Sequence, residues 1–199
     1  MRRFALLVLP ALLLPFAIAP SSASEPARPA AAGTFNVDPV HSSVIFRVKH
    51  AGTSWFYGTF TKISGSFTLD ADHPTTSTAL IEIAADSIDS RSANRDQHLK
   101  SEAFFNAKEF PSIIFETTAV EETESGLRLT GRLTLLGQTH EITADAVHVG
   151  EGEFQGKRSG WETTFEIKRS DFGMTYGVEQ GALGDDVRVI VSLEGVQAE

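Results

Sequence analysis

Apolar and polar residues alternate along most of this chain between residues 43 and 193. Val44, Phe46 and Val48 alternate with polar neighbours. A two-residue period is typical of strands that bury one face. The same period recurs, with local interruptions, at residues 66–69, 81–83, 112–117, 127–135, 142–146, 161–167 and 187–193. The pattern therefore predicts an all-β protein of about eight strands.

Short segments rich in glycine, proline and small polar residues separate the predicted strands. The predicted turns lie at Ser64-Gly65, residues 71–74, Ser125-Gly126, Gly137, residues 150–156 and residues 181–184. Parallel neighbours need crossovers of a dozen residues or more, so short links favour an antiparallel up-and-down meander. Closing such a meander into a barrel removes its exposed edges. We therefore expect an antiparallel β-barrel.

One segment departs from the strand period. Residues 93–105 are rich in helix formers, and Ser92 precedes them as a candidate N-cap. Leu99 belongs to the apolar face of this segment, and Phe104 and Phe105 extend that apolar surface. The sequence therefore predicts one short helix that covers an end of the barrel.

The N-terminal residues follow a different pattern. Two arginines precede an apolar stretch at residues 4–19, which contains prolines and is followed by small residues. This order is typical of a secretory signal peptide, and the stretch is shorter than the about 20 residues of a membrane-spanning helix. We predict a cleaved signal peptide at residues 1–23, a disordered leader at 24–33, a folded domain at 34–197, and no transmembrane segment in the mature chain.

Composition narrows the possible partners and chemistry. Removal of residues 1–23 leaves 15 basic and 26 acidic residues, a formal charge of −11, and the acidic residues are dispersed along the chain. This balance argues against a nucleic-acid partner and disfavours firm docking to anionic lipid surfaces. The chain contains no cysteine, which excludes thiol chemistry. A domain of about 165 residues buries enough surface to fold without disulfides.

Motifs that would indicate an enzyme are incomplete. His140-Glu141 begins a zinc-protease motif, but Ala144 stands where the second histidine ligand is required. The glycines at 150, 152 and 156 lack dinucleotide-binding spacing, and the Asp-Phe-Gly triplet at 171–173 has no phosphate-binding or catalytic loop beside it. The other histidines lack short ligand spacing. We therefore expect no catalytic residues and no obligatory metal.

Several short motifs occur together in a recognisable order. They are residues 38–46, Val48-Lys49-His50, Gly58-Thr59-Phe60, residues 95–101 with Phe104-Phe105, residues 111–115, residues 131–137, residues 169–173 and Asp186-Val187. In this order they resemble the YceI-like polyisoprenoid-binding family, over residues 34–196. Phe110 stands where that family usually has tyrosine. The resemblance implies a lipocalin-like antiparallel barrel that encloses an isoprenoid chain in the periplasm.

The resemblance and the alternation together give a candidate ligand site. The expected lipid contacts are apolar residues on inward strand faces and aromatic residues at the mouth. They are Phe46, Val48, Phe60, Phe67, Leu69, Ile83, Phe104, Phe105, Phe115, Leu133, Leu135, Trp161, Phe165, Ile167 and Phe172. His50, Arg169 and Asp171 are candidates for a polar mouth. Alternation alone does not distinguish a ligand cavity from a core filled by side chains.

Two functions fit these expectations. The first is periplasmic binding, storage or transport of an isoprenoid or similar amphiphilic lipid, with the lipid as ligand and no obligatory cofactor. Transfer of a hydrocarbon chain out of water gains about 0.8 kcal/mol per CH₂, so an apolar barrel needs few polar contacts to bind it. The alternative is an enzyme, or an accessory subunit, that acts on the head group of an isoprenoid or quinone lipid. The sequence identifies no protein partner.

Overall fold

The computed structural model describes residues 32–124 and 126–199. The predicted signal peptide, residues 1–23, and most of the predicted leader lie outside these residues. The first strand begins at Gly33, the last residue of the predicted leader. Within the described residues, no helix is both long and apolar enough to cross a membrane.

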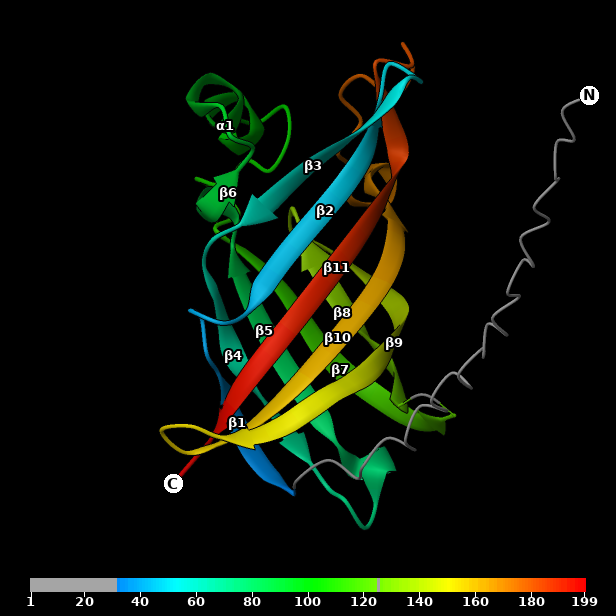
Figure 1. Ribbon diagram of the computed structural model, residues 1–199. Helices are drawn as coiled ribbons and strands as arrows, with labels where there is room; N and C mark the ends of the chain where they lie inside the picture. The colour runs from blue at the N-terminus through cyan, green and yellow to red at the C-terminus, as the bar shows by residue number, and fades with distance from the viewer. Residues whose placement is uncertain (1–31, 125) are drawn as a thin grey trace, which may run out of the picture.

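Eight strands form a closed antiparallel ring (Figure 1). β11 pairs with β10 on one side and with β1 on the other, which closes the ring. The strands in ring order are β1 (Gly33–Val37), β4 (Ile63–Leu69), β5 (Thr78–Ala84), β7 (Ser112–Thr123), β8 (Gly126–Leu135), β9 (Gln138–Glu153), β10 (Lys157–Lys168) and β11 (Leu183–Gln197). This ring confirms the predicted antiparallel barrel of about eight strands.

Three further strands extend the wall at one end of the barrel. They are β2 (Ser43–His50), β3 (Ser54–Phe60) and β6 (Ile88–Asp89). β2 pairs with β11 beyond the part that β1 occupies, β3 pairs with β2, and β6 adds two residues to β3. We call the end that carries β2 and β3 the upper end, because it is uppermost in Figure 1, and the end that carries β1 the lower end.

The predicted helix is present but shorter than expected. α1 (Ala93–Lys100) lies at the upper end beside β6 (Figure 1), whereas the sequence predicted residues 93–105. It ends because Ser101 has an extended backbone and its hydroxyl donates to the His98 carbonyl, which competes with helical hydrogen bonds. Ser92 occupies the N-cap position without a side-chain cap hydrogen bond. The remaining helical turns are η1 (Pro74–Thr76), η2 (Ala85–Ser87) and η3 (Arg169–Phe172).

The hairpin turns are tighter than the sequence suggested. Leu136 and Gly137 both have positive φ, 53° and 71°, in the two-residue link between β8 and β9. Such a turn matches the twist of antiparallel strands, and glycine adopts it without strain. The loop predicted at residues 150–156 contains fewer residues than expected, because Gly150 and Gly152 still pair with β10.

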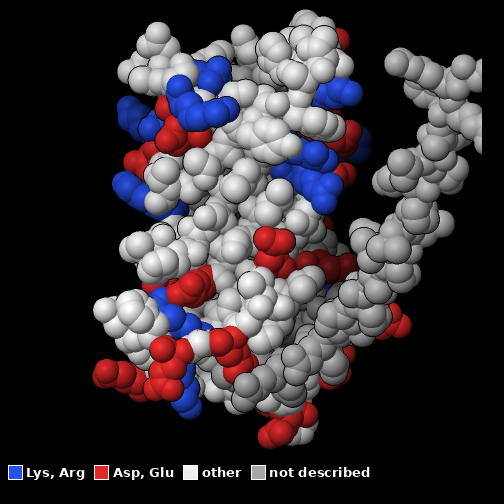
Figure 2. Space-filling view, viewed as in Figure 1, with Lys and Arg blue, Asp and Glu red and all other residues white. Residues whose placement is uncertain are grey.

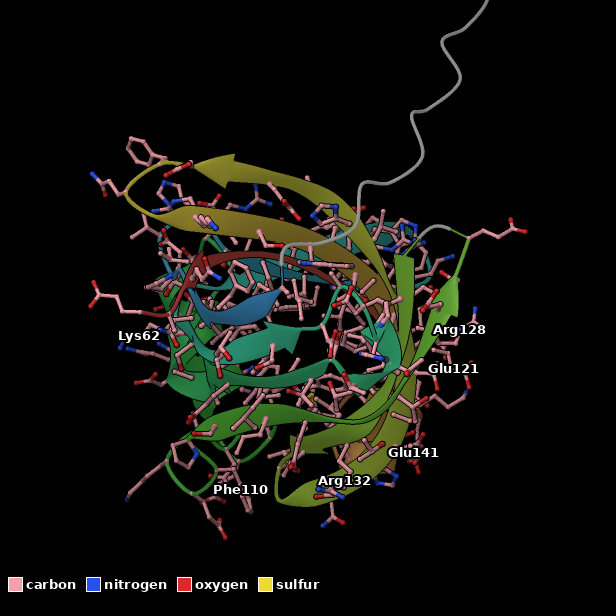
Figure 3. The ribbon with its side chains drawn as sticks, turned by 90° about the horizontal axis from the view of Figure 1, so that it is seen from below. Lys62, Phe110, Glu121, Arg128, Arg132 and Glu141 are labelled. Atoms are coloured by element: carbon pink, nitrogen blue, oxygen red, sulfur yellow. The ribbon has the colours of Figure 1, made fainter. Side chains whose placement is uncertain are left out.

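Charged side chains lie on the outside of the wall. Seen from below the barrel, the labelled Lys62, Arg128, Arg132 and Glu141 lie outside the ring of strands (Figure 3). Two of these form exposed ion pairs with neighbouring strands: Arg128 with Asp145, and Arg132 with Glu116. Such exposed pairs contribute little to stability. The packing of side chains inside the barrel therefore contributes more to its stability.

Aromatic side chains pack against one another in the lower half of the barrel. Phe35 is fully buried and stacks on Phe67 with ring centroids 5.4 Å apart. Gly195 leaves the room that these rings occupy, since a Cβ there would lie 2.5 Å from the Phe67 ring and 2.7 Å from the Phe35 Cβ. The indole N–H of Trp161 donates to the buried Ser159 hydroxyl at 3.0 Å. These contacts form a packed floor.

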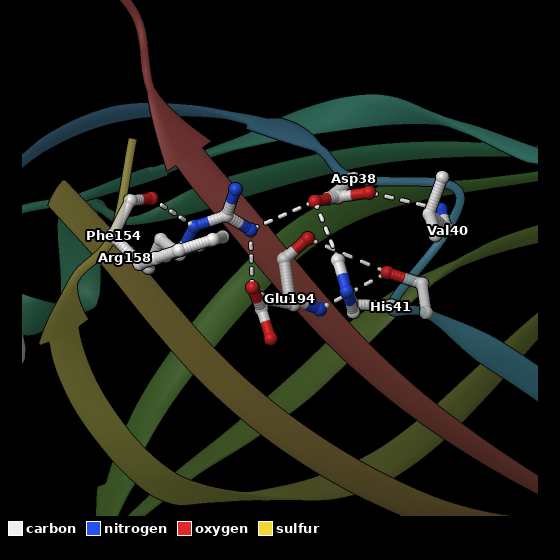
Figure 4. Close-up of polar contacts among 7 residues, drawn as sticks. Asp38, Val40, His41, Phe154, Arg158 and Glu194 are labelled. Carbon is white, nitrogen blue, oxygen red and sulfur yellow. Dashed lines mark hydrogen bonds and ion pairs between the residues drawn. The ribbon is translucent and has the colours of Figure 1, made fainter. Parts of the chain in front are cut away.

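A polar cluster fastens the link between β1 and β2 to the neighbouring strands (Figure 4). Arg158 Nη1 donates to Asp38 Oδ2 at 2.7 Å and also pairs with Glu194. Asp38 further accepts from the Val40 amide and bonds to His41 Nδ1, both at 2.9 Å. The hydrogen bond from Arg158, followed by those from His41 and Val40, holds the pKa of Asp38 well below its usual range.

Candidate ligand-binding site

The upper half of the barrel is hollow. It contains a cavity of about 460 Å³, a volume within the range of about 300–1,000 Å³ typical of small-molecule sites. The inward-facing residues of neighbouring strands form the wall of the cavity, because they lie side by side in the register of the sheet. Val48 lies opposite Val187, and Phe46 opposite Val189. The cavity is therefore a space inside the barrel, bounded by the strands themselves.

The predicted contact residues divide between two spaces. Three of them, Phe67, Leu69 and Trp161, line a smaller space of about 60 Å³ in the lower half. Phe172, expected at the mouth, lines neither space and is buried with its ring 4.8 Å from that of His140. The η3 turn directs it there. Eleven of the fifteen line the large cavity: Phe46, Val48, Phe60, Ile83, Phe104, Phe105, Phe115, Leu133, Leu135, Phe165 and Ile167.

Sequence reasoning missed part of the wall. The inward face of β11 has the same alternation as the other strands and was recognisable from it. Tyr176 and Met174 come from the link between η3 and β11, where no period marks an inward residue. Arg95 and His98 come from α1, whose position over the barrel no sequence pattern specified. The β11 residues on the wall are Leu183, Val187, Val189, Val191 and Leu193.

Most of the polar side chains that line the cavity gather at its upper end, which we call the mouth. They are His50, Arg95, His98, Arg169 and Tyr176. Among the described residues, no carboxylate lines this cavity. The mouth thus combines two guanidinium groups with imidazole and phenol groups above an apolar interior. This arrangement matches an amphiphile whose apolar chain points inward.

Arg169 is the most buried charged residue at the mouth, with 3% of its surface exposed. Its Nε donates to the Gly184 carbonyl at 2.8 Å, Nη1 to Met174 at 2.9 Å and Nη2 to Tyr176 at 2.8 Å. Burial lowers the pKa of the guanidinium and attraction by Asp185 opposes this, yet an arginine remains charged in proteins. Arg169 therefore holds the loop in place and keeps a positive charge beside the cavity.

The carboxylate near Arg169 is Asp185 rather than the predicted Asp171. Asp171 is exposed and does not line the cavity. Asp185 accepts hydrogen bonds from the Ser170 amide at 2.9 Å and from the Ser170 hydroxyl at 2.7 Å. Burial alone raises the pKa of Asp185, but these hydrogen bonds hold it below its ordinary value. The candidate polar mouth therefore retains His50 and Arg169 and excludes Asp171.

Aromatic rings from two segments meet at the mouth. The rings of His98, Phe104 and Tyr176 lie 5.0 to 5.2 Å apart, centroid to centroid. Phe105 contacts Phe60 edge to face at 5.4 Å. These contacts join α1 and the turns after it to the loop before β11. Aromatic side chains therefore frame the mouth of the cavity.

The α1 side of the mouth is anchored by polar contacts. Arg95 lies over the Phe56 ring, with 4.5 Å from its guanidinium carbon to the centroid, and donates to the Ser90 hydroxyl and carbonyl. Asp96 accepts from the amide and hydroxyl of Ser90. The hydrogen bond from the Ser90 hydroxyl is the main reason that the pKa of Asp96 is lowered. These contacts fix α1 in the absence of a side-chain N-cap.

A second cluster lies at the lower end, away from the cavity. Asp38, His41 and Glu194 each offer one potential metal-ligand atom, and these atoms lie within 4.8 Å of one another. No spacing in the sequence pointed to this group. Arg158 contacts both carboxylates and supplies the positive charge between them. The cluster is therefore a structural ion-pair network in this conformation.

Comparison with known proteins gives consistent matches. The family model described as YceI-like domain matches residues 35–195. Protein YceI of Salmonella arizonae is 40% identical over 159 residues, which cover 79% of this chain and 82% of that protein. The solved structure of the Campylobacter jejuni YCEI protein is 26% identical, with a TM-score of 0.67, and the match covers 76% of this chain and 90% of that one.

Two more distant structures share the fold. BcnA of Burkholderia cenocepacia is 22% identical with a TM-score of 0.73, over 79% of this chain and 98% of that one. A polyisoprenoid binding domain from Saccharophagus degradans, implicated in plant cell wall breakdown, is 12% identical with a TM-score of 0.62. That match covers 84% of this chain and 100% of the domain. At these identities the likeness is one of fold.

Proposed function

We propose that this chain, which belongs to the YceI-like family, binds a long-chain isoprenoid or a similar amphiphilic lipid in its upper cavity. One observation carries the proposal: an apolar cavity of about 460 Å³ has nearly all of its polar lining groups at one end. The polyisoprenoid binding domain from Saccharophagus degradans, which has the same fold, supports the ligand class.

The two ends of the cavity suit different parts of such a ligand. Apolar walls stabilise a hydrocarbon chain by about 0.8 kcal/mol for each CH₂ removed from water, without selecting its detailed structure. At the mouth, Arg95 and Arg169 carry positive charge, and the imidazole of His50 is a further hydrogen-bonding group. Charged donors favour anionic or carbonyl-bearing groups. The proposed ligand therefore has an apolar chain and a polar head that stays near the mouth.

The proposed activity is binding, storage or transport rather than catalysis. Among the described residues, the cavity lining offers imidazole, guanidinium and phenol groups and one threonine hydroxyl, but no carboxylate, serine or cysteine. That hydroxyl, of Thr163, donates to the Asp145 carbonyl and has no carboxylate base beside it in the lining. Nucleophilic catalysis needs an activated nucleophile beside a base, so this lining favours a carrier over an enzyme that acts on the lipid head group. With residues 1–23 as a signal peptide, the proposed location is the periplasm.

Organic extraction of the purified, exported protein followed by mass spectrometry tests this proposal. We expect about one isoprenoid or related lipid per chain, and we expect added long-chain isoprenoids to raise the melting temperature of delipidated protein, because a ligand that binds only the folded state stabilises it. Absence of lipid from the extract, together with an unchanged melting temperature, would exclude a carrier. Conversion of the bound lipid to a product would favour the enzyme.

A further inference from the structure

The outer surface beside the mouth combines exposed aromatic side chains with basic side chains that lie against them. We propose that this surface docks on an anionic lipid bilayer, which brings the cavity mouth to the membrane. We call it the docking face. Its residues are Ile45, Arg47 and Lys49 of β2, Trp55 and Tyr57 of β3, and Arg188 of β11.

The docking face exposes large apolar side chains at the upper end. Trp55 is 47% exposed, Tyr57 45% and Ile45 37%. They face outward because Val44, Phe46 and Val48, which alternate with the outward residues of β2, line the cavity. Tryptophan and tyrosine are enriched where proteins meet the membrane–water interface, since one part of each ring is apolar and the other polar.

The same face carries cations that lack acidic partners. Arg47 lies opposite Arg188 in the register of β2 and β11. Within residues 32–124 and 126–199, neither these two nor Lys49 forms an ion pair. The Nε atom of each arginine is buried and has no hydrogen-bond partner. Like charges directly opposite each other are unfavourable. A phosphate group that binds both guanidinium groups relieves this repulsion.

The aromatic and basic residues of this face form one unit. The guanidinium of Arg47 lies 4.3 Å from the centroid of Trp55, and the Lys49 ammonium lies 5.6 Å from it. Nearby carboxylates are few: Glu166 lies opposite Arg188 on the β10 side, and Asp186 is paired with Lys168 at 3.6 Å. The cationic groups of Arg47 and Lys49 and the exposed indole of Trp55 therefore lie close enough to contact the same membrane surface.

Charge is unevenly distributed over the molecule, which changes the conclusion drawn from net charge. Lys and Arg gather over the upper part of the face in Figure 2, whereas Asp and Glu predominate toward the lower end. β10 alone has 12 residues, a length of about 40 Å at about 3.3 Å per residue. Electrostatic screening acts over about 8 Å at physiological ionic strength. The acidic lower end therefore does not prevent the upper end from approaching an anionic surface.

A bilayer suits this face better than an acidic protein or a second copy of the chain. Its cations border on exposed aromatic side chains, the combination found on proteins that bind anionic interfaces. Lys49 and Trp55 lie opposite each other at the upper end of β2 and β3, next to His50 of the mouth, so docking places the mouth close to the membrane. This last step rests on the proposed function, since only a carrier of membrane lipids needs that position.

Co-sedimentation with vesicles tests the docking face. We expect the wild-type protein to bind vesicles of mixed phosphatidylglycerol and phosphatidylcholine, to bind pure phosphatidylcholine much less, and to dissociate as salt is raised. Arg47→Gln combined with Arg188→Gln is expected to weaken binding to the anionic vesicles by roughly tenfold or more. Arg128→Gln combined with Lys157→Gln is the matched control, because it removes the same charge from the lower end.

Fluorescence provides a second readout. The chain has two tryptophans, so Trp161→Phe leaves Trp55 as the sole tryptophan emitter. We expect its emission to shift to shorter wavelength with anionic vesicles, because the indole leaves water. The proposal would be overturned if wild-type protein did not bind anionic vesicles. It would also be overturned if both double variants weakened vesicle binding equally.

A third outcome would also overturn the proposal: wild-type protein that self-associates but does not bind vesicles, with self-association abolished in the Arg47→Gln/Arg188→Gln variant. That result would assign the docking face to a second copy of the chain. Extraction of lipid from the same double variant separates the two hypotheses. Retained cavity lipid with lost vesicle binding supports docking. Absence of lipid from wild-type protein refutes the carrier and leaves the vesicle result to decide docking by itself.

Discussion

The two halves of this barrel share strands and alternation, yet the upper half encloses a cavity of about 460 Å³ and the lower half a space of only about 60 Å³. In the lower half, Phe35 and Phe67 stack on each other. In the upper half, the ring of Phe46 lies over Gly58 and the ring of Phe115 over Gly131. Phe67 covers Gly195 in the same way in the lower half, so the difference lies in what the rings meet on their inner side. Phe67 meets the ring of Phe35, whereas Phe46 and Phe115 line the cavity. Alternation thus determines which side chains face inward. Whether inward side chains contact one another across the barrel depends on the size of the side chains around them.

The same charged substitution in each half gives the largest expected difference. Phe67→Asp places a carboxylate in the packed floor, which costs several kcal/mol and leaves the protein unfolded at 25 °C. Phe115→Asp places it on a cavity that water can enter, so we expect a folded, less stable protein without bound lipid. Circular dichroism and lipid extraction measure the two effects.

The exposed Thr118→Asp on the same strand serves as the control. It is expected to keep both fold and lipid. If Phe115→Asp unfolds as completely as Phe67→Asp, the upper half is a packed core and the contrast between the halves disappears.

Adding one methyl group to a glycine in each half gives the next largest difference. Gly195→Ala drives a Cβ against the Phe67 ring and the Phe35 Cβ, and such overpacking costs about 1–3 kcal/mol. Gly58→Ala meets only ring atoms of Phe46 among its nearest contacts, and that ring has cavity beside it. We expect urea denaturation to show less than about 1 kcal/mol for Gly58→Ala. Equal losses would contradict a hollow upper half.

Removing aromatic volume gives a smaller effect. Phe67→Leu in the floor is expected to cost about 1–2 kcal/mol, because it loses a stacked ring and leaves a gap. Phe165 lines the cavity, and its replacement by leucine keeps an apolar wall. We therefore expect Phe165→Leu to lower the free energy of unfolding of delipidated protein by less than half as much as Phe67→Leu. A greater loss of stability for Phe165→Leu, measured by urea denaturation, would show that Phe165 is part of a packed core.

Acidification gives the smallest and most local effect. Because the folded-state pKa of Asp38 is lowered, chiefly by Arg158, its contribution is fully present above its unfolded pKa of about 3.9 and is lost as pH falls below that value. We therefore expect Asp38→Asn to lower the urea midpoint at pH 7, with a difference from wild type that shrinks below about pH 4. Bound lipid should not change. A difference independent of pH would mean that Asp38 does not act through its charge.

The strands were largely predictable because alternation survives wherever one face is buried. Seven of the eight predicted segments lie in the ring, and the eighth is β2, which extends the wall beside β1. β1 and β3 escaped prediction: Trp55, Phe56 and Tyr57 are consecutive aromatic residues, so β3 shows no polar alternation. The end of α1 depended on one local hydrogen bond, from the Ser101 hydroxyl to a carbonyl, which no periodic pattern reveals.

The candidate site was less predictable than the strands. Inward-facing residues such as Phe115 and Phe165 follow from the period, but their division between cavity and floor depends on distances across the barrel. His50 and Arg169 came from family resemblance, and the carbonyls that Arg169 holds are identified only by the loop conformation. Asp171, the third candidate for the polar mouth, is exposed and does not line the cavity. Its position depends on the conformation of η3, which no periodic pattern in the sequence reveals.

The pairing of β11 has a consequence for how the chain is made. This strand, residues 183–197, is the last in sequence and bridges β10 to both β1 and β2. Until β11 leaves the ribosome, the ring strands therefore form an open sheet with unpaired edges at β1 and β10, and β2 lacks its partner as well. Closure over such a sequence separation is slow, and unpaired edges favour aggregation.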